Sequence, residues 1–188
     1  MLVEMCYNYK KEYGRLIMRY LIVVDMQVDF ITGTLGSEQA KAIVSKVVDK
    51  VKSFDGEVIF TRDTHYENYM FTQEGKNLPV PHCIKGSNGW EICDELKPYV
   101  KNIIDKYTFG SIDLPKFIQS FDNSIESIEL CGLCTDICVI SNAFILKAAF
   151  PEIPISVDAL CSAGVSIESH NNALNAMRAI QIQITEGV

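Results

Sequence analysis

The chain has 188 residues, 48% of them hydrophobic, which is enough to bury the core of one domain. Its 17 basic and 24 acidic residues give a formal net charge of −7, and the lack of a basic stripe argues against nucleic acids and anionic membranes as partners. Seven cysteines in a chain of this length, with no signal peptide and no apolar run of transmembrane length, argue against a disulfide framework and predict a cytoplasmic protein that binds small molecules.

The first 17 residues differ from the rest of the chain, because charged side chains interrupt every short apolar group and leave no secretory core. Met18 directly precedes the first strongly patterned stretch, and we expect the natural start of the protein there. We therefore predict an N-terminal extension at residues 1–17 and a single domain at residues 18–188.

Two apolar runs in the first third of the chain predict strands with polar residues directly after them. Tyr20 to Val24 is a continuous aliphatic run, typical of a strand that is buried on both faces of a parallel sheet, and Asp25 follows it. Val58 to Phe60 predicts a second strand, which leads into Asp63 and His65. These three polar side chains are therefore expected at the carboxyl ends of two strands.

Three further segments predict strands. They are Ile103–Ile104, Ile125–Leu130 and Ile155–Val157. Lys106 comes after the third strand, Cys138 after the fourth, and Asp158 at the end of the fifth. The C-terminal residues 181–185 fit either the frayed end of a helix or an edge strand, and periodicity does not decide between the two.

Helical patterns separate the strands. The predicted helices are a Ser37-capped helix with apolar positions from Ala40 to Val51, a short helix at Trp90–Leu96 that Pro98 ends, a helix at Val139–Phe150, and a helix capped by Ser166 with Glu168 that runs to about Arg178. The stretch Thr72–Gly89 has no period of either kind, which is typical of a functional loop.

Strands that alternate with helices predict a Rossmann-like, three-layer α/β/α fold around a mostly parallel sheet of five to six strands. Ligands of such folds bind beyond the carboxyl ends of the strands. Polar residues of different chemical types fall at that edge: Asp25, Asp63, His65, Lys106 and Cys138. The sequence therefore predicts one active site along this edge.

A carboxylate, a lysine and a thiol at one edge suit nucleophilic catalysis without a histidine. Cys138 is expected in the first turn of a helix that follows a turn at Gly132, where the helix dipole favours the thiolate. Asp25 can take the thiol proton and later deliver it to a leaving amine, and Lys106 adds a positive field. The alternative is a small buried cysteine, a loop-capping aspartate and a solvated lysine.

A second group of residues suits a metal ion. Asp63 and His65 form a D-x-H pattern, and His82 comes from the following loop. One carboxylate and two imidazoles fit zinc, iron or manganese and leave coordination positions open for water or substrate. An isolated D-x-H is also common in surface loops. We predict that the third histidine, His170, lies on the surface of the last helix.

Cys131 and Cys134 form a C-x-x-C pattern, which would also fit a redox pair or half of a zinc knuckle. The sequence contains no second C-x-x-C, and this one does not directly open a helix. Redox chemistry is therefore the third-ranked hypothesis.

Five motifs occur in the order that a known enzyme family shows. They are VVDMQVDF at 23–30, TRDTHYENY at 61–69, PVPHCIKGSNGWE at 79–91, DKYTFGS at 105–111 and GLCTDICV at 132–139. From Met18 onward the chain resembles the isochorismatase-like cysteine hydrolases, and among them the nicotinamidases. The resemblance implies a family sheet of six strands and hydrolysis of nicotinamide to nicotinate and ammonia through a cysteinyl thioester.

The resemblance also assigns roles to residues of this sequence. The implied roles are Asp25, Lys106 and Cys138 as catalytic triad, the N–H groups of Cys134 and Cys138 as oxyanion hole, Asp63, His65 and His82 as ligands of a divalent metal that orients the pyridine ring, Phe30 and Gln27 as substrate-binding residues, and a cis peptide bond at Leu133–Cys134. Zinc is the expected ion, with iron and manganese as alternatives, and a homo-oligomer is the expected assembly.

The chain departs from the nicotinamidase pattern at one wall of the ring pocket. Many nicotinamidases carry a tryptophan shortly before the metal-binding histidine, where this chain has residues 78–81, Leu-Pro-Val-Pro. Two alternatives therefore stay open: the same catalytic residues acting on another small amide, including pyrazinamide-like compounds, and a ligand-binding member of the family without catalysis.

Overall fold

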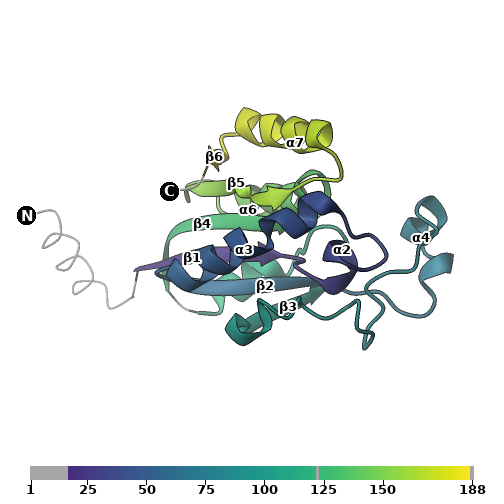
Figure 1. The fold of residues 1–188 in the computed structure, drawn as a ribbon. Helices are drawn as coiled ribbons and strands as arrows, with labels where there is room; N and C mark the ends of the chain where they lie inside the picture. Colours follow the sequence, from purple (N-terminus) through teal and green to yellow (C-terminus); the bar gives the residue numbers. More distant parts are fainter. Residues whose placement is uncertain (1–16, 122, 187–188) are drawn as a thin grey trace, which may run out of the picture.

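The computed structural model describes residues 17–121 and 123–186, and it contains one six-stranded parallel sheet with the order β3-β2-β1-β4-β5-β6 (Figure 1). The strands are β1 (Ile17–Val24), β2 (Glu57–Asp63), β3 (Asn102–Lys106), β4 (Ser124–Leu133), β5 (Ile155–Ala163) and β6 (Gln183–Thr185). The predicted extension lies outside the described residues, except that Ile17 begins β1. The predicted fold class is confirmed.

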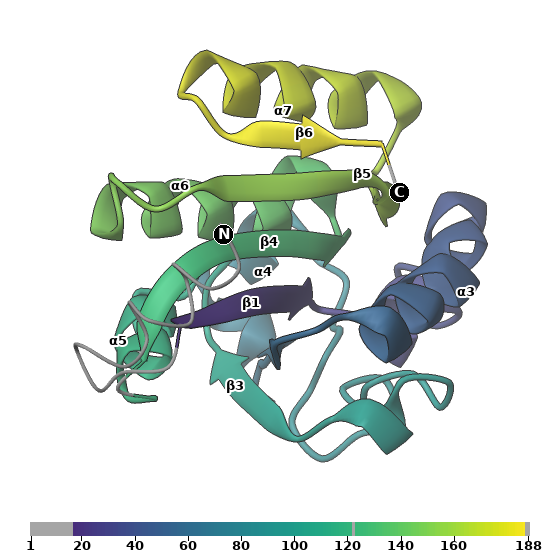
Figure 2. The ribbon, with the colours of Figure 1, turned by 90° about the vertical axis from the view of Figure 1, so that its left-hand side faces the viewer.

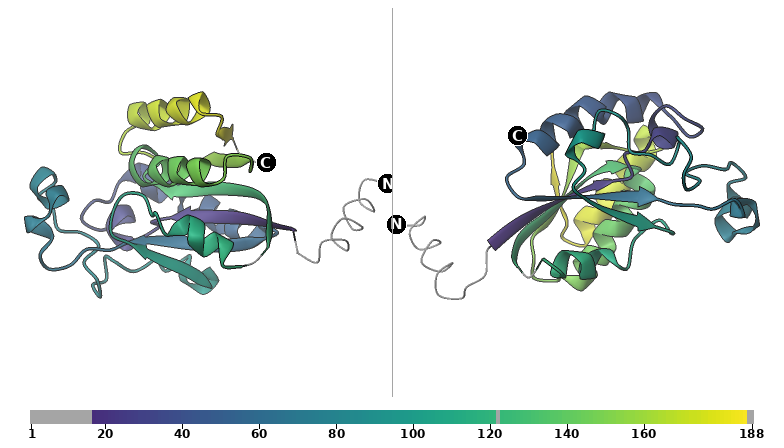
Figure 3. Two further views of the ribbon diagram at one scale, coloured as in Figure 1. Left: turned by 180° about the vertical axis from the view of Figure 1, so that it is seen from behind. Right: turned by 90° about the horizontal axis from the view of Figure 1, so that it is seen from below.

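Helices cover both faces of the sheet. They are α2 (Val28–Ile31), α3 (Glu38–Ser53), α4 (Gln73–Asn77), α5 (Leu114–Gln119), α6 (Ile140–Ala149) and α7 (Ile167–Ala179), with the 3-10 turns η1 (Tyr69–Phe71) and η2 (Lys97–Tyr99) and the π turn η3 (Thr135–Val139). In Figure 2 the strands lie between α3 on one side and α5 and α6 on the other, and the left view of Figure 3, from behind, shows the face that carries α5 and α6. No helix in the described part of the chain is both long and apolar enough to cross a membrane.

The alternation of side chains along β1 explains the two cores. Tyr20, Ile22 and Val24 are fully buried among residues of α5, α6 and α7, whereas Leu21 and Val23 are fully buried among residues of α3. Successive side chains of a strand point to opposite faces, so a strand covered on both sides has no polar positions. The continuous apolar run therefore predicts its own location at the centre of the sheet.

The predicted helix after the first strand is confirmed as α3. The Ser37 side chain accepts a hydrogen bond from Ala40 N, and the buried positions Ala40, Ile43, Val47 and Val51 follow the helical period. Residues 181–185 contain the short edge strand β6, which decides the question that periodicity left open.

The predicted helix at Trp90–Leu96 is wrong. This segment pairs with the loop after β1 instead: Ile92 forms an antiparallel bridge with Gln27, and Cys93 N donates to Met26 O at 2.9 Å. Because tertiary partners take these backbone groups, the segment does not close helical turns, and Pro98 lies inside η2 rather than after a helix.

The stretch Thr72–Gly89 was predicted to be an irregular loop, but it contains the short helix α4. Thr72 caps this helix by accepting a hydrogen bond from Gly75 N at 3.0 Å. The segment with η1 and α4 projects beyond the carboxyl ends of the strands in Figure 1. It thus lies at the edge where the sequence predicts the active site.

Two predictions for the C-terminal third need correction. The α7 capping box joins Ser166 to Ser169, not to Glu168. The fifth strand does not end at Asp158. The Asp158 carboxylate accepts hydrogen bonds from Leu160 N and Cys161 N, and β5 then resumes its pairing with β4. Asp158 is buried and forms an ion pair of 2.7 Å with Lys50 of α3, which makes it part of the core.

Candidate active site

Three of the predicted residues meet at the carboxyl edge of the sheet. Asp25 follows β1, Lys106 ends β3, and Cys138 lies in η3 after β4. Lys106 Nζ lies 2.7 Å from Asp25 Oδ2 and 3.5 Å from Cys138 Sγ. Their exposed fractions are 0%, 2% and 6%, so this charge pair and the thiol are sheltered from solvent.

The carboxyl group of Asp25 is held in place by the neighbouring strand. Asp25 has a positive φ of 47°, and Thr61 Oγ1 donates to its Oδ1 at 2.7 Å. Burial raises the pKa of Asp25, and the positive charge of Lys106 opposes that rise. A carboxyl with a raised pKa is a stronger base than an exposed one, and Asp25 and Cys138 both lie against Lys106 Nζ.

The surroundings of Cys138 differ from those predicted. The turn between β4 and α6 is a π turn, and the regular helix begins only at Ile140. Burial raises the pKa of the Cys138 thiol well above its usual value, although Lys106 lowers it. The helix end was expected to favour the thiolate, but desolvation by burial has the larger, opposite effect on the pKa of this thiol. A thiol with a raised pKa needs a base before it can act as a nucleophile, and Asp25 is the nearby candidate.

The turn before Cys138 has unusual backbone geometry. Gly132 has φ of 117°, and a Cβ atom there would collide with the Val24 carbonyl, so a larger residue does not fit against β1. The Leu133–Cys134 peptide bond is cis, as expected from the resemblance. Cys134 O then accepts hydrogen bonds from the N–H groups of Ile137 and Val139, which closes the turn.

Lys106→Met should damage catalysis more than folding, because methionine replaces the stem of the lysine but removes its charge. Loss of a preorganised charge of this kind typically costs about two to three orders of magnitude in rate. Turnover and thermal unfolding would be compared with those of Lys101→Met, which changes an exposed lysine directly before the same strand. Turnover near that of the unchanged protein in folded Lys106→Met would remove Lys106 from the mechanism.

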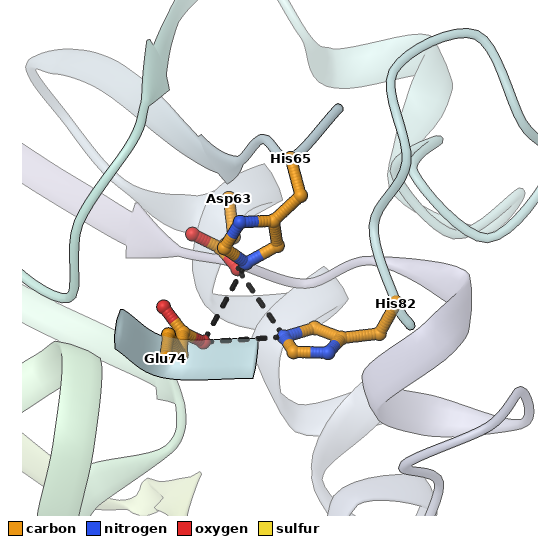
Figure 4. A group of neighbouring side chains, drawn as sticks. All are labelled: Asp63, His65, Glu74 and His82. Carbon is orange, nitrogen blue, oxygen red and sulfur yellow. Dashed lines mark ion pairs between the residues drawn. The ribbon is translucent and has the colours of Figure 1, made fainter. Parts of the chain in front are cut away.

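A second cluster contains the predicted metal ligands and one residue that the sequence did not indicate. Asp63 ends β2, His65 follows it, His82 comes from the loop after α4, and Glu74 lies in α4. One ligand atom from each of these four residues lies within 4.8 Å of the others (Figure 4). Thr72 could have indicated Glu74, because a threonine often caps a helix and Glu74, two positions later, then lies in the first helical turn.

The donor atoms of this cluster fit a metal ion. His82 Nδ1 lies 2.8 Å from Val80 O, which leaves its Nε2 free to face the cluster. His65 Nε2 lies 3.0 Å from Asp63 Oδ2, yet this buried nitrogen has no partner with hydrogen-bonding geometry among the described residues. Two imidazole nitrogens and two carboxylates around one point are a typical ligand set for zinc and related divalent ions.

The charges of the cluster also favour a cation. Burial alone would raise the pKa of Asp63, but Lys106 and His65 lower it to about 2. Burial would likewise raise the pKa of Glu74, and the two histidines lower it to about 2. Burial lowers the pKa of His65, but Asp63 and Glu74 raise it to about 9. The two carboxylates are thus ionised at neutral pH and offer negative charge.

Gln27 does not have the position expected for a substrate-binding residue. Its side chain is fully buried, and its Nε2 donates to the carbonyls of Asp63 and Trp90 at 2.8 and 2.9 Å. Its Oε1 accepts from Asp63 N at 2.7 Å. Gln27 therefore holds the backbone of a candidate metal ligand, and it does not line the cavity.

One cavity of about 300 Å³ connects the two clusters. Cys134 and Cys138 line one part of it, and Asp63, Glu74 and His82 line another. Its apolar residues are Phe30, Leu35, Leu78, Phe109, Ile137 and Val165. Of residues 78–81, Leu78 lines the cavity, so this wall carries an aliphatic side chain where many nicotinamidases have a tryptophan. Together with the polar residues of the lining it can accommodate a small, partly apolar ligand.

Phe30 lies where the resemblance implies, in the wall of this cavity. Its ring centroid is 5.6 Å from that of His82. The carboxylate of Asp29 accepts a hydrogen bond from Cys83 N at 2.7 Å, which ties the Phe30 loop to the His82 loop.

The remaining cysteines and the third histidine have other surroundings. The described cysteines are free, and Cys131 is fully buried with a pKa raised by that burial, so the C-x-x-C pattern does not form a reactive pair. We predicted His170 on the surface of the last helix, and this prediction needs correction. His170 is half-buried, and its Nδ1 lies 2.8 Å from Thr135 Oγ1.

Comparison with known proteins agrees with this arrangement. Residues 19–187 match the isochorismatase domain. The nicotinamidase/pyrazinamidase of Mycobacterium tuberculosis is 25% identical over 186 residues, which cover 89% of this chain and 98% of that protein. Among solved structures, the nicotinamidase/pyrazinamidase of Bacillus subtilis has 27% identity and a TM-score of 0.80, and it covers 90% of this chain and 100% of that one.

The pyrazinamidase of Pyrococcus horikoshii, solved in complex with zinc, has 25% identity and a TM-score of 0.76, and it covers 89% of this chain and 98% of that one. The matched family extends over nearly the whole domain, and the cavity joins the Cys138 thiol to a candidate metal cluster. The chain therefore belongs to the isochorismatase family.

Proposed function

We propose that this amidohydrolase converts nicotinamide to nicotinate and ammonia through a thioester on Cys138. The observation that carries the proposal is the single cavity of about 300 Å³, which has a thiol with its acid-base partner at one end and a metal-ligand set at the other. A ring carboxamide needs both: a nucleophile for the amide carbon and an anchor for the ring. The names of the Mycobacterium and Bacillus relatives support the same substrate class.

The geometry suits a cycle in which one carboxylate handles every proton. Asp25 takes the proton from Cys138 Sγ, and the sulfur attacks the carboxamide carbon. The N–H groups of Cys134 and Cys138 stabilise the oxyanion, while Lys106 balances the negative charge on Asp25 and sulfur. Asp25 then protonates the leaving nitrogen, so that ammonia departs and the thioester remains.

Hydrolysis of the thioester uses the same residues in the reverse sense. Asp25, now ionised again, removes a proton from an incoming water, and the resulting hydroxide attacks the thioester carbon. The C–S bond breaks, the proton on Asp25 returns to Cys138, and the product leaves as nicotinate after losing its carboxyl proton to solvent. One water is consumed for each amide bond, and the site returns to its resting state.

Asp63, His65, His82 and Glu74 would hold the divalent metal. When bound, the metal supplies a Lewis-acidic position to which a ring nitrogen of the substrate can coordinate. We propose zinc, because the donors are imidazole and carboxylate and because the Pyrococcus pyrazinamidase was solved with zinc. Iron and manganese accept the same donors.

The test is ammonia release from a panel of nicotinamide, pyrazinamide, benzamide and a small aliphatic amide. We expect nicotinamide to give the highest kcat/KM. A second candidate, the same residues acting on another small amide, is favoured by Leu78 in the cavity wall, and preference for the aliphatic amide would support it over our proposal. No release from any amide by metal-loaded protein would indicate a ligand-binding member without catalysis.

A role in NAD salvage, a cytoplasmic location and a homo-oligomeric assembly remain predictions. The assembly can be checked by size-exclusion chromatography with light scattering, in which a monomer mass would contradict the prediction.

A further inference from the structure

His170 links the last helix to the turn that carries the nucleophile. It lies in α7, and its Nδ1 is 2.8 Å from the Oγ1 of Thr135, the first residue of η3. Thr135 is fully buried, and within the described part of the chain His170 is the only hydrogen-bond partner of its hydroxyl. Cys134 directly precedes Thr135 and Cys138 follows three residues later, so this bond lies between the two groups that must face the substrate.

A second contact joins the same two segments. Asp136 Oδ1 accepts a hydrogen bond from Val165 N at 3.1 Å, in the corner between β5 and α7. Gly164 in this corner has no room for a Cβ atom, because His170 and Asp136 lie against it. Val165 itself lines the cavity. The corner and the π turn are therefore packed tightly together and held at two points.

We propose that His170 is a positioning residue, which through Thr135 fixes the π turn so that Cys138 and the Cys134 N–H group lie correctly for the reaction. The proposal rests on Cys138 being the nucleophile, but it does not depend on nicotinamide as substrate. A π turn closes a wider ring than an α-helical turn and is rare in proteins, and such turns occur frequently at functional sites. A side-chain contact from outside the turn restricts the alternative conformations open to it.

The protonation state of His170 suits this positioning role. Burial lowers its pKa, so the imidazole is neutral at neutral pH. A neutral imidazole can accept from the Thr135 hydroxyl or donate to it through Nδ1, and both arrangements give the same contact. The hydrogen bond is thus retained without placing a charge beside the nucleophile.

The first test compares three single variants and one double variant by kcat and KM. His170→Leu keeps the packing volume but removes the bond, Thr135→Val removes the hydroxyl, and His170→Asn retains a polar atom near the position of Nδ1. A hydrogen bond of this kind contributes up to about tenfold, so we expect kcat to fall roughly tenfold in His170→Leu and Thr135→Val, with KM almost unchanged. His170→Asn should recover most of the loss.

The double variant His170→Leu with Thr135→Val should be no worse than either single variant, because both remove the same bond. Asn172→Leu, an exposed change in the same helix, serves as the control. Losses that multiply in the double variant, or no loss in kcat for folded His170→Leu, would overturn the proposal. If His170→Leu does not fold, Thr135→Val and His170→Asn decide it by the same comparison.

A second readout is independent of the substrate. The rate at which iodoacetamide alkylates Cys138, followed by peptide mass, should fall about tenfold in His170→Leu and Thr135→Val but not in Asn172→Leu. A turn that moves takes the thiol away from Lys106, the positive charge that favours its thiolate form. Equal alkylation rates in all proteins would contradict the proposal. If the unchanged protein does not hydrolyse nicotinamide, the proposed function fails, while the alkylation rates still test His170.

Discussion

Cys138→Ala should abolish amide hydrolysis, whereas Cys134→Ala should retain substantial activity. Cys138 Sγ lies 3.5 Å from Lys106 Nζ and in contact with Asp25, so it alone has both a base and a positive charge beside it. Cys134 also lines the cavity, but its proposed contribution is the backbone N–H group, which alanine keeps. Removal of a nucleophile that forms a covalent intermediate typically costs about six orders of magnitude in kcat, which is close to complete loss.

The comparison is made at saturating substrate, with metal content and thermal unfolding measured for both variants. Thermal unfolding separates a loss of folding from a loss of catalysis in each variant, because Cys138 is buried and Cys134 is only partly buried. Activity that survives in Cys138→Ala and disappears in Cys134→Ala would exchange the roles of the two residues. Equal loss in two folded, metal-loaded variants would show that the thiol of Cys134 also takes part.

Nicotinamide should be preferred strongly over benzamide, and this preference should depend on the metal ligands. Benzamide has the same carboxamide and ring shape but no ring nitrogen. A site built around a specific polar contact can reject the analogue that lacks it by roughly 10⁴-fold. His65→Ala or His82→Ala should remove most of the preference by impairing the nicotinamide reaction, and chelator treatment should do the same reversibly.

Metal content gives a readout apart from activity. Elemental analysis should find stoichiometric divalent metal in the unchanged protein and in Glu67→Ala, an exposed change in the same loop as His65. Both His65→Ala and His82→Ala should lose it, and Glu74→Ala should bind it more weakly, because Glu74 contributes one of the four donor groups. Equal turnover of the two amides, or full activity in metal-free protein, would contradict the role of the metal as ring anchor.

The sequence predicted the central part of the fold because burial leaves a direct signature there. β1 is covered on both faces, so its residues from Tyr20 to Val24 are all apolar, and the first polar residue, Asp25, marks the strand end. The same reasoning placed Asp63 and Lys106 at strand ends, and parallel pairing brings those ends together. The local sequence therefore predicted which polar residues lie together at the carboxyl edge of the sheet.

Features that depend on contacts between distant segments were not predicted. Trp90–Leu96 has a helix-like pattern, but its backbone bonds go to the loop after β1. His170 lies in a polar helix segment and gains its partner only when α7 packs on η3. The state of the Cys138 thiol likewise depends on burial by several elements, which no short window of sequence reports.

The central claim, a covalent thioester on Cys138, is tested most directly by mass spectrometry of protein quenched with acid during turnover of saturating nicotinamide. The protein would be digested under acidic conditions, and every cysteine peptide would be examined for an attached nicotinoyl group. We predict that this group is found on the peptide containing Cys138 and that it disappears once the substrate is consumed. A nicotinoyl group on Cys134, or release of ammonia with no acyl group on any cysteine, would contradict the proposed mechanism.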